Sequence, residues 1–324
     1  MNIYTSILDY ISKLPVVEAW SDVKSLLDHA EAMQPRDWQL PLISCQAMGG
    51  SEEDAIPACA AIACAQVGII LIDDLLDDDP RGAYHQLGVG QTANYAAALL
   101  SSALQAIHHS SAPPAVKLAA VQGLNQMITT IAFGQYLDAQ NPTNEAGYWR
   151  VVQSKSGPFF RTALELGAFF GGTSEKNLND IGKIGYLYGE MIQIHDDLHD
   201  CMTEPAGPDW IQGRASLPIL FAQTVDHPER VHFLELSKRI SDTESLHEAQ
   251  SILIRCGSVS YCIHQLLYRY QTASKLLTEM NLAMPESVSK LLDDLVIPVY
   301  RLLESNGMYR TEFPSLVKYL EIGE

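Results

Sequence analysis

Apolar side chains recur every three or four residues along most of the chain, the spacing that gathers them on one face of an α-helix. Alternation with a period of two, rich in valine, isoleucine and threonine, is hard to find, so strands are not expected. Glycine and proline interrupt the helical pattern at intervals and leave about ten predicted helices between them. These breaks fall at residues 49–50, 79–82, 110–114, 140–147, 171–172, 204–213 and 227–228. We therefore predict an all-α protein.

Two of the predicted helices, residues 56–74 and 181–197, are apolar on almost every side, which is typical of helices at the centre of a bundle. Stretches rich in alanine or leucine at residues 97–107 and 119–133 are suited to pack around them as further walls. Both central helices end in aspartates. We expect a helical bundle around a central cavity that is apolar inside and acidic at its mouth.

The organisation of the chain favours a single domain over residues 1–324. Its length allows one large domain or two small ones. No glycine–serine or proline-rich linker, fixed-period repeat or low-complexity tract divides it, which favours the first. The longest apolar run, residues 55–76, contains Gln66 and ends in aspartates, so we expect a buried helix there and no membrane span.

Composition and charge narrow the range of functions. Hydrophobic residues make up 47% of the chain and charged residues 19%, as in ordinary globular proteins with a core. The formal net charge of -18 argues against binding nucleic acid, because no basic surface displaces counterions from phosphates. Carboxylates can still hold a phosphorylated small molecule through divalent cations. The six cysteines form no Cys-x-x-Cys pair and the N-terminus lacks secretory signal features, so we expect a reducing, cytoplasmic location.

Aspartates with the same spacing end both central helices. They are Asp73, Asp74 and Asp77 in the first cluster, and Asp196, Asp197 and Asp200 in the second cluster. The i, i+4 spacing places the outer two carboxylates of each cluster on one helical face. Two such charges about 4 Å apart repel by roughly 4 kcal/mol at an effective dielectric constant near 20, so a buried cluster calls for a cation. Hard oxygen ligands at this density favour Mg²⁺, which commonly bridges carboxylates and phosphates.

Each cluster taken alone is compatible with an ordinary solvated acidic turn, because like charges on an exposed helix lose only about 0.2–0.5 kcal/mol per pair. Their repetition at the ends of two buried helices argues for a shared metal site instead. His195 and His199 lie within the same helix end, but neither has the partner spacing of a zinc site, and zinc is not expected.

Short motifs outside the two clusters follow one another along the chain. They are DPRG at residues 79–82, GQYLD at 134–138, KSG at 155–157, FRTALELG at 160–167, QIHDD at 193–197, PAGPD at 205–209 and GRASLPIL at 213–220. Together with the clusters they resemble the trans-isoprenyl diphosphate synthase family of isoprenoid synthases, over roughly residues 35–303. The resemblance implies a class I isoprenoid synthase helical bundle, an allylic isoprenoid diphosphate as substrate, three Mg²⁺ ions and a homodimer.

The resemblance also implies roles for individual side chains. Three aspartates would be the leading metal ligands, and the others further ligands or hydrogen-bond acceptors behind them: Asp73, Asp77 and Asp196 lead, and Asp74, Asp197 and Asp200 follow. Three cations would bind the diphosphate, which leaves as an anion: Arg81, Lys155 and Arg214. Gln193 would lie near the allylic cation, and Gln135 would belong to the substrate site. The ordinary alternatives for the three cations are surface charges or a helix-end charge.

The acceptor site of the family, which binds isopentenyl diphosphate, is largely missing. Residues 36–41 read RDWQLP where the family has Gly-Lys-x-x-Arg-Pro, so Asp37 stands in place of a basic residue. Gln66 replaces the expected histidine, and Arg81 alone remains of the usual pair of arginines. One guanidinium, on Arg36, does not match the several cations that normally hold a trianion. We therefore expect no cationic pocket around Asp37 and Gln66.

This combination leaves three hypotheses open. The first is a class I terpene synthase that cyclises or rearranges an allylic diphosphate without isopentenyl diphosphate. The second is a prenyltransferase, either a polyprenyl or geranylgeranyl diphosphate synthase or an enzyme with a non-diphosphate acceptor. The third is a regulatory partner subunit of a synthase, against which the intact aspartate clusters argue. Gly68 and Ile69 are expected to leave the cavity floor open for a C15 or longer chain, with C20 preferred.

Overall fold

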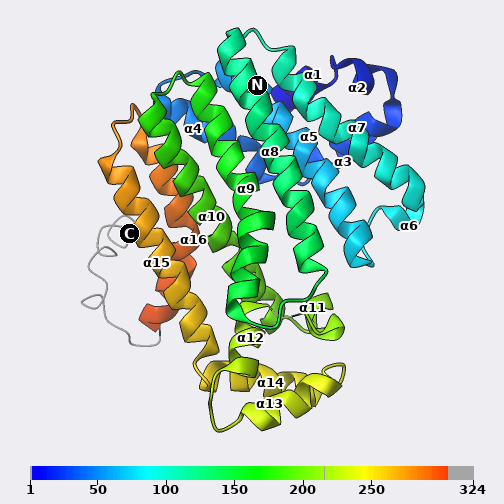
Figure 1. The fold of residues 1–324 in the computed structure, drawn as a ribbon, viewed down its shortest axis with the longest axis vertical. Helices are drawn as coiled ribbons and strands as arrows, with labels where there is room; N and C mark the ends of the chain where they lie inside the picture. Colours follow the sequence, from blue (N-terminus) through cyan, green and yellow to red (C-terminus); the bar gives the residue numbers. More distant parts are fainter. Residues whose placement is uncertain (1, 215, 306–324) are drawn as a thin grey trace.

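The computed structural model describes residues 2–214 and 216–305, and every regular element within these ranges is a helix (Figure 1). This confirms the all-α prediction. In chain order the elements are α1 (Ile3–Ile11), α2 (Pro15–Ala19), α3 (Ser21–Glu31), the 3-10 helix η1 (Arg36–Gln39), α4 (Leu40–Met48), α5 (Glu52–Asp77), α6 (Tyr84–Leu87), α7 (Val89–His108), α8 (Pro114–Asp138), α9 (Glu145–Phe170), α10 (Glu175–Met202), α11 (Pro208–Gln212), α12 (Leu217–Thr224), α13 (Arg230–Leu236), η2 (Ser237–Arg239), α14 (Thr243–Arg255), α15 (Ser258–Glu279) and α16 (Pro285–Ser305).

The number of helices exceeds the ten or so predicted, because several are very short. α2, α6 and α11 span little more than one turn, so they leave no recurring apolar pattern in the sequence. α11 lies inside residues 204–213, which were predicted as a break, and this part of the prediction is wrong. Elsewhere the predicted breaks do separate helices, as at Gly49 between α4 and α5, where the backbone turns left-handed.

α5 is the central helix of the bundle and packs against α4, α7 and α9. It begins at a capping box in which Ser51 and Asp54 each bond the other's backbone N–H. Among the described helices it alone is long and apolar enough to cross a membrane, but 72% of its most apolar stretch is buried in the bundle. It is therefore a core helix, as predicted for residues 56–74, and it extends beyond them at both ends.

α9 and α10 cross so closely that glycine is required at the contact. A Cβ atom on Gly185 would lie 2.6 Å from the carbonyl oxygen of Phe160, and one on Gly189 would lie 3.0 Å from the Cα of Gly157. Because both glycines lack that atom, the two helices touch over a long stretch. This contact fixes the register in which α9 and α10 present their polar side chains to the interior.

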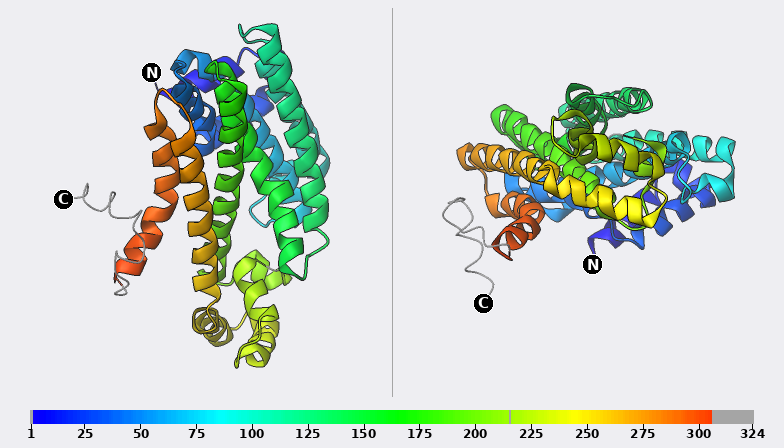
Figure 2. Two further views of the ribbon diagram at one scale, coloured as in Figure 1. Left: turned by 60° about the vertical axis from the view of Figure 1, so that its left-hand side comes forward. Right: turned by 90° about the horizontal axis from the view of Figure 1, so that it is seen from below.

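A second, smaller core lies at one end of the bundle, and we call the helices α11–α14 that form it the cap (Figures 1 and 2). Trp210 and Phe233 pack at its centre with ring centroids 6.0 Å apart. Trp210 Nε1 donates a hydrogen bond to the carbonyl oxygen of Cys201, 3.1 Å away, which ties the cap to the last turn of α10. The cap therefore sits next to the end of the helix that carries the second cluster. A single domain over residues 1–324 stays a prediction.

Candidate active site

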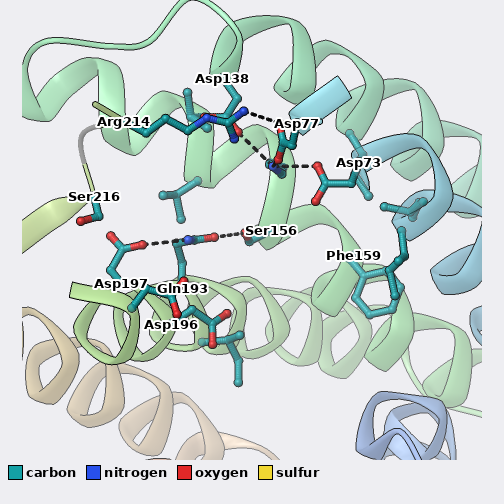
Figure 3. A pocket seen from close by; sticks show the side chains of 18 of the residues that line it. Asp73, Asp77, Asp138, Ser156, Phe159, Gln193, Asp196, Asp197, Arg214 and Ser216 are labelled. Atoms are coloured by element: carbon teal, nitrogen blue, oxygen red, sulfur yellow. Dashed lines mark hydrogen bonds and ion pairs between the residues drawn. The ribbon is translucent and has the colours of Figure 1, made fainter. Parts of the chain in front are cut away.

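A cavity of about 600 Å³ opens between α5, α8, α9 and α10. Both clusters line it: α5 contributes Asp73 and Asp77, and α10 contributes Asp196, Asp197 and Asp200. Figure 3 shows the labelled members of the two clusters on opposite sides of this space. The fold thus brings together two motifs that lie far apart in the sequence, and their carboxylates face one cavity.

Two cations compensate the first cluster. The ammonium nitrogen of Lys155, on α9, lies 2.9 Å from Asp73 Oδ1 and 2.9 Å from Asp138 Oδ2, and 3.8 Å from Asp77. Arg214 Nη2 lies 2.8 Å from Asp77 Oδ1. Burial lowers the pKa of Lys155, but the carboxylates of Asp73 and Asp138 outweigh that effect and raise it overall. The side chain therefore stays charged.

The second cluster is divided between a buried and an open carboxylate. Asp197 is 4% exposed and accepts hydrogen bonds from Tyr148 Oη (2.7 Å), from the backbone N–H of Leu217 (2.7 Å) and from Gln193 Nε2 (2.9 Å). Gln193 Oε1 in turn accepts a hydrogen bond of 2.7 Å from Ser156 Oγ. These bonds fix both ends of the Gln193 amide at the cavity wall (Figure 3).

Asp196 has a different environment from Asp197. Asp196 is exposed to solvent, and it shares the cavity lining with the acids Asp37 and Asp200. Burial of the carboxyl group, and then the charges of Asp200 and Asp37, raise the pKa of Asp196 to about 6. Three like-charged groups around one open space leave this side of the cavity in need of positive charge.

The donor set of the cavity fits Mg²⁺ in kind, because it consists of hard carboxylate oxygens from both clusters and lacks soft ligands among the described lining residues. In the part of the chain that the structure describes, no three such side chains converge on one point. Lys155 and Arg214 account for this at the first cluster, since they already contact the carboxylates that would hold an ion there.

The prediction for Gly68 is wrong. Gly68 is buried and faces α7, where an added Cβ would lie 3.1 Å from Leu100 Cγ and 3.2 Å from the carbonyl oxygen of Ala96. Its missing side chain lets α5 and α7 approach each other and does not widen the cavity. Ile69, its neighbour, does line the cavity, together with Phe159 across it on α9.

Three further predicted residues lie at the edge of the site or behind it. Gln135 is buried and donates a hydrogen bond to Asp73. It therefore lies behind the first cluster and is not itself among the described lining residues. Asp74 is likewise not among the described lining residues. Arg81 lines the cavity, but its guanidinium forms a bidentate pair with Asp79 at 2.8 and 3.1 Å and is 83% exposed.

A chain of hydrogen bonds links η1 to α5 at the Asp37 end of the cavity. Trp38 Nε1 donates to Gln66 Oε1 (2.8 Å), and Gln66 Nε2 donates to Asp37 Oδ2 (2.6 Å). Arg36 forms an ion pair with Asp294 and is not among the described lining residues. The basic residues that do line the cavity are Arg81, Lys155 and Arg214, and each contacts a carboxylate of α5, α8 or the loop after α5. The absence of a cationic pocket around Asp37 and Gln66 stays a prediction.

Sequence reasoning missed several side chains that build the site. Asp138 shares Lys155 with the first cluster, and Tyr148 and Ser156 orient Asp197 and Gln193. Asp138 and Ser156 stand inside motifs that had been noted, so the motif positions were a usable signal. Tyr148 gave no signal, because its contact with α10 spans 49 positions of the sequence.

Comparison with known proteins adds an independent observation. Residues 38–253 match the sequence pattern of the polyprenyl synthetase family. A geranylgeranyl diphosphate synthase of Methanosarcina mazei is 26% identical over 236 residues, which cover 68% of this chain and 71% of that protein.

Two solved structures share the fold. The geranylgeranyl pyrophosphate synthetase of Pyrococcus horikoshii superposes with a TM-score of 0.78 at 21% identity, covering 91% of this chain and 94% of that one. The polyprenyl synthase of Caulobacter crescentus, complexed with calcium and isoprenyl diphosphate, gives a TM-score of 0.75 at 21% identity, with 91% and 93% covered. At this identity the two structures establish the helical bundle and its topology.

Proposed function

Because the chain belongs to the polyprenyl synthetase family, we propose that it is a prenyltransferase that ionises an allylic isoprenoid diphosphate of C15 or longer with the help of Mg²⁺. The prenyl group would then form a bond to a second molecule. The observation that supports this most strongly is the meeting of two aspartate clusters, Lys155 and Arg214 on one cavity. The relative from Methanosarcina mazei, which is named as a geranylgeranyl diphosphate synthase, favours prenyl transfer over the cyclisation that the sequence alone placed first.

The residues divide the work between the diphosphate and the allylic chain. Asp73, Asp77 and Asp196 would hold the metal ions, with Asp200 as a further ligand. When bound, Mg²⁺ supplies positive charge to the departing diphosphate. Asp197 accepts three hydrogen bonds, and through those from Gln193 and Leu217 it would hold Gln193 and the start of α12 in place. Three ions, a homodimer and a cytoplasmic location remain predictions.

Lys155 and Arg214 would stabilise the negative charge that develops as the allylic C–O bond breaks. Both are cations held at the rim of the first cluster by carboxylates, so their N–H groups are positioned before the substrate arrives. Ile69, Ile131 and Phe159 line the deeper cavity and would surround the prenyl chain, excluding water from the cation. The fixed amide of Gln193 would face the cation from the α10 side.

The proposal is tested by incubating the protein with Mg²⁺ and farnesyl or geranylgeranyl diphosphate and measuring released diphosphate. Lys155→Met should reduce kcat by about 100-fold or more, since removal of one group that stabilises transition-state charge typically has that effect. Asp73→Asn should act similarly. Lys183→Met is the matched control, because Lys183 pairs only with Asp180 on the exposed face of α10. Unchanged diphosphate release by Lys155→Met and Asp73→Asn would refute the proposed site.

A terpene synthase is the second candidate, and the Asp37–Gln66 pair is the observation that favours it. Among the described residues no cation lines that end of the cavity to bind isopentenyl diphosphate, and a double bond of the same chain would then attack the allylic cation instead. Hydrocarbon products formed from geranylgeranyl diphosphate alone would favour this candidate. A longer diphosphate formed only with isopentenyl diphosphate would exclude it.

A further inference from the structure

We infer that the end of the cavity formed by Asp37 and Gln66 binds an uncharged acceptor that donates an N–H or O–H hydrogen bond to Asp37. This acceptor would take the place of a second diphosphate, so the enzyme prenylates a neutral nucleophile. The inference rests on the proposed function, because it names the second substrate of the same site.

The hydrogen-bond chain fixes the polarity of this end. The indole N–H of Trp38 can only donate, so Gln66 must turn its carbonyl oxygen toward it. The Gln66 amide nitrogen then donates to Asp37 Oδ2. Trp38 is fully buried. If the Gln66 amide were rotated by about 180°, its N–H group would face the Trp38 N–H inside the protein, and neither donor would have an acceptor. The other oxygen of Asp37, Oδ1, has no hydrogen-bond donor among the described residues and is the group that this end offers to a ligand.

The charges near Asp37 exclude an anionic second substrate. Asp37 and Asp196 both line the cavity and interact electrostatically. Arg36, the nearest guanidinium along the chain, forms an ion pair with Asp294 on α16 and also interacts electrostatically with Asp37. An ionised carboxylate about 4 Å from a single negative charge repels it by an energy that corresponds to roughly three orders of magnitude in affinity at an effective dielectric constant near 20. A diphosphate carries several such charges, whereas a neutral donor carries none and gains a charge-assisted hydrogen bond.

The same end of the cavity adjoins the place where the cation forms. Asp37, Gln66, Ile69 and Gln193 line one continuous space with the second cluster. Phe160 also lines it and packs edge-on against Tyr188, with ring centroids 5.3 Å apart, which gives this space an aromatic wall. An acceptor held there by Asp37 can reach an allylic carbon without leaving the cavity.

Transfer of the prenyl group to the acceptor needs only the diphosphate as leaving group and Asp37 as proton acceptor. The allylic C–O bond breaks, and its electron pair leaves with the diphosphate. The acceptor nitrogen or oxygen that donates its hydrogen bond to Asp37 forms the new bond to the allylic carbon. Its N–H or O–H bond breaks, and the proton passes along that hydrogen bond to Asp37 and then to water. No oxidant or reductant is required.

The test compares pairs of acceptors that differ by one hydrogen-bond donor, using the full-length protein with Mg²⁺ and geranylgeranyl diphosphate. The donors are 3-methyl-3-buten-1-ol, phenol and indole, and each is paired with its O- or N-methyl derivative. Isopentenyl diphosphate is the charged counterpart of the alkenol. We expect prenylated adducts with at least one donor, roughly 10-fold less with its methylated partner, and no elongation with isopentenyl diphosphate.

Variants at Asp37 test the charge directly. Asp37→Asn presents an amide donor to the cavity in place of an acceptor, and should lower adduct formation by about 10-fold or more. The double variant Asp37→Lys, Gln66→His supplies the missing cations and should gain elongation with isopentenyl diphosphate. Asp28→Lys makes the same change of charge on the exposed face of α3 and is the matched control.

The outcomes separate this inference from the proposed function. If no combination releases diphosphate, the proposed function fails and this inference fails with it. If diphosphate is released but only prenyl alcohol forms with every donor, this inference alone is overturned. If hydrocarbon is the product with every donor, the prenyltransferase proposal is overturned together with it, in favour of the terpene synthase. Elongation with isopentenyl diphosphate by the unaltered protein, or equal use of the donors and their methylated partners, would overturn it as well. The acceptor pairs need no variant, so the test holds even where an Asp37 variant does not fold.

Discussion

Lys155 stands where carboxylates from two different helices meet, Asp73 and Asp77 on α5 and Asp138 on α8. The repulsion expected from the aspartate spacing is thus relieved inside the protein before any ion binds. The Lys155 side chain makes three ion contacts and is only 22% exposed, so its loss would leave three partly buried carboxylates without their shared cation.

Replacing Lys155 with methionine should destabilise the protein by about 1–3 kcal/mol in the absence of divalent ions. Mg²⁺ should restore part of this stability, since the vacated carboxylates then gain a cation. Urea unfolding with Mg²⁺ and with EDTA measures both effects. Lys183→Met, at an exposed i, i+3 pair, should change stability by less than about 0.5 kcal/mol. If Lys155→Met unfolds at the same urea concentration as the unaltered protein with EDTA, Lys155 is not the counterion of the cluster.

Asp196 gives the metal-free protein a stability that depends on pH. Burial and neighbouring acids raise its pKa from 3.8 to about 6, so the folded state binds this proton more tightly than the unfolded state does. The contribution is fully present below about pH 4 and is lost as pH rises through about 6. Because Asp196 stays in contact with solvent, we expect a loss of the order of 1 kcal/mol.

Asp196→Asn should remove this dependence. Its unfolding free energy, measured in EDTA from about pH 5 to about pH 7, should fall less than that of the unaltered protein. Parallel curves for the two proteins would show that Asp196 titrates at an ordinary pH.

Residue spacing alone identified the aspartates of the site, but it did not predict the role of each aspartate. The i, i+4 pattern identified the aspartates because their helix geometry is local. It did not separate Asp196, which is open to the cavity, from Asp197, whose oxygens are bonded to Tyr148 and Leu217. Those partners lie on other helices, and a periodic pattern in one helix carries no information about them.

Of the described glycines at helix contacts, Gly167, where α9 packs against α4, leaves the least room for a side chain. A Cβ on Gly167 would overlap the carbonyl oxygen of Pro41 and the hydroxyl of Ser44. Neither atom lies at the end of a long flexible side chain, so the helices would have to separate. Gly123, in the middle of α8, has 3.9 Å of clearance to its nearest neighbour, Thr162.

Gly167→Ala and Gly123→Ala should therefore have opposite effects. The first should destabilise the protein by about 2–4 kcal/mol through overpacking. The second should stabilise it by about 0.5–1 kcal/mol, because alanine is the better helix former and meets no clash. Thermal unfolding of the pair measures both. A stabilising Gly167→Ala would mean that α4 and α9 are farther apart than the structure places them.

Long helices could be predicted from the sequence more reliably than short ones. α5, α7, α8 and α10 all contain the apolar stretches read from the sequence, because several turns repeat the pattern. Gly68 is an example of what the apolar pattern could not predict. Its position on α5 followed from the sequence, but which side of α5 faces α7 depends on how the helices pack. The choice between cavity wall and helix contact is set by the tertiary structure.

On the scale of the whole molecule, the described chain holds two hydrophobic cores of unequal size. The larger one fills the bundle, and the smaller one fills the cap. The hydrogen bond from Leu217 N–H to Asp197 and the contact of Trp210 with the end of α10 join the cap to the second cluster. The smaller core buries fewer apolar side chains than the bundle does, so it is expected to open more readily.

Phe233→Ala removes a fully buried ring at the centre of the cap. The local cost should be about 3–5 kcal/mol. Hydrogen exchange should therefore speed up in α11–α14 by at least about 100-fold while α5 stays protected. Phe233→Leu, which keeps most of the volume, is the milder control. Equal loss of protection in α5 and the cap would show that the two cores unfold as one unit.

The buried α5 also has a consequence for how the chain is made. It packs against α7, which leaves the ribosome after the short α6, and against α9, which is complete only at Phe170. At about 5–20 residues per second, synthesis from the end of α5 to the end of α9 takes between roughly five and twenty seconds. During that interval a segment as apolar as a membrane helix is without its full set of neighbours. We expect its pairing with α7 during translation to protect it from the insertion machinery and from chaperones until α9 arrives.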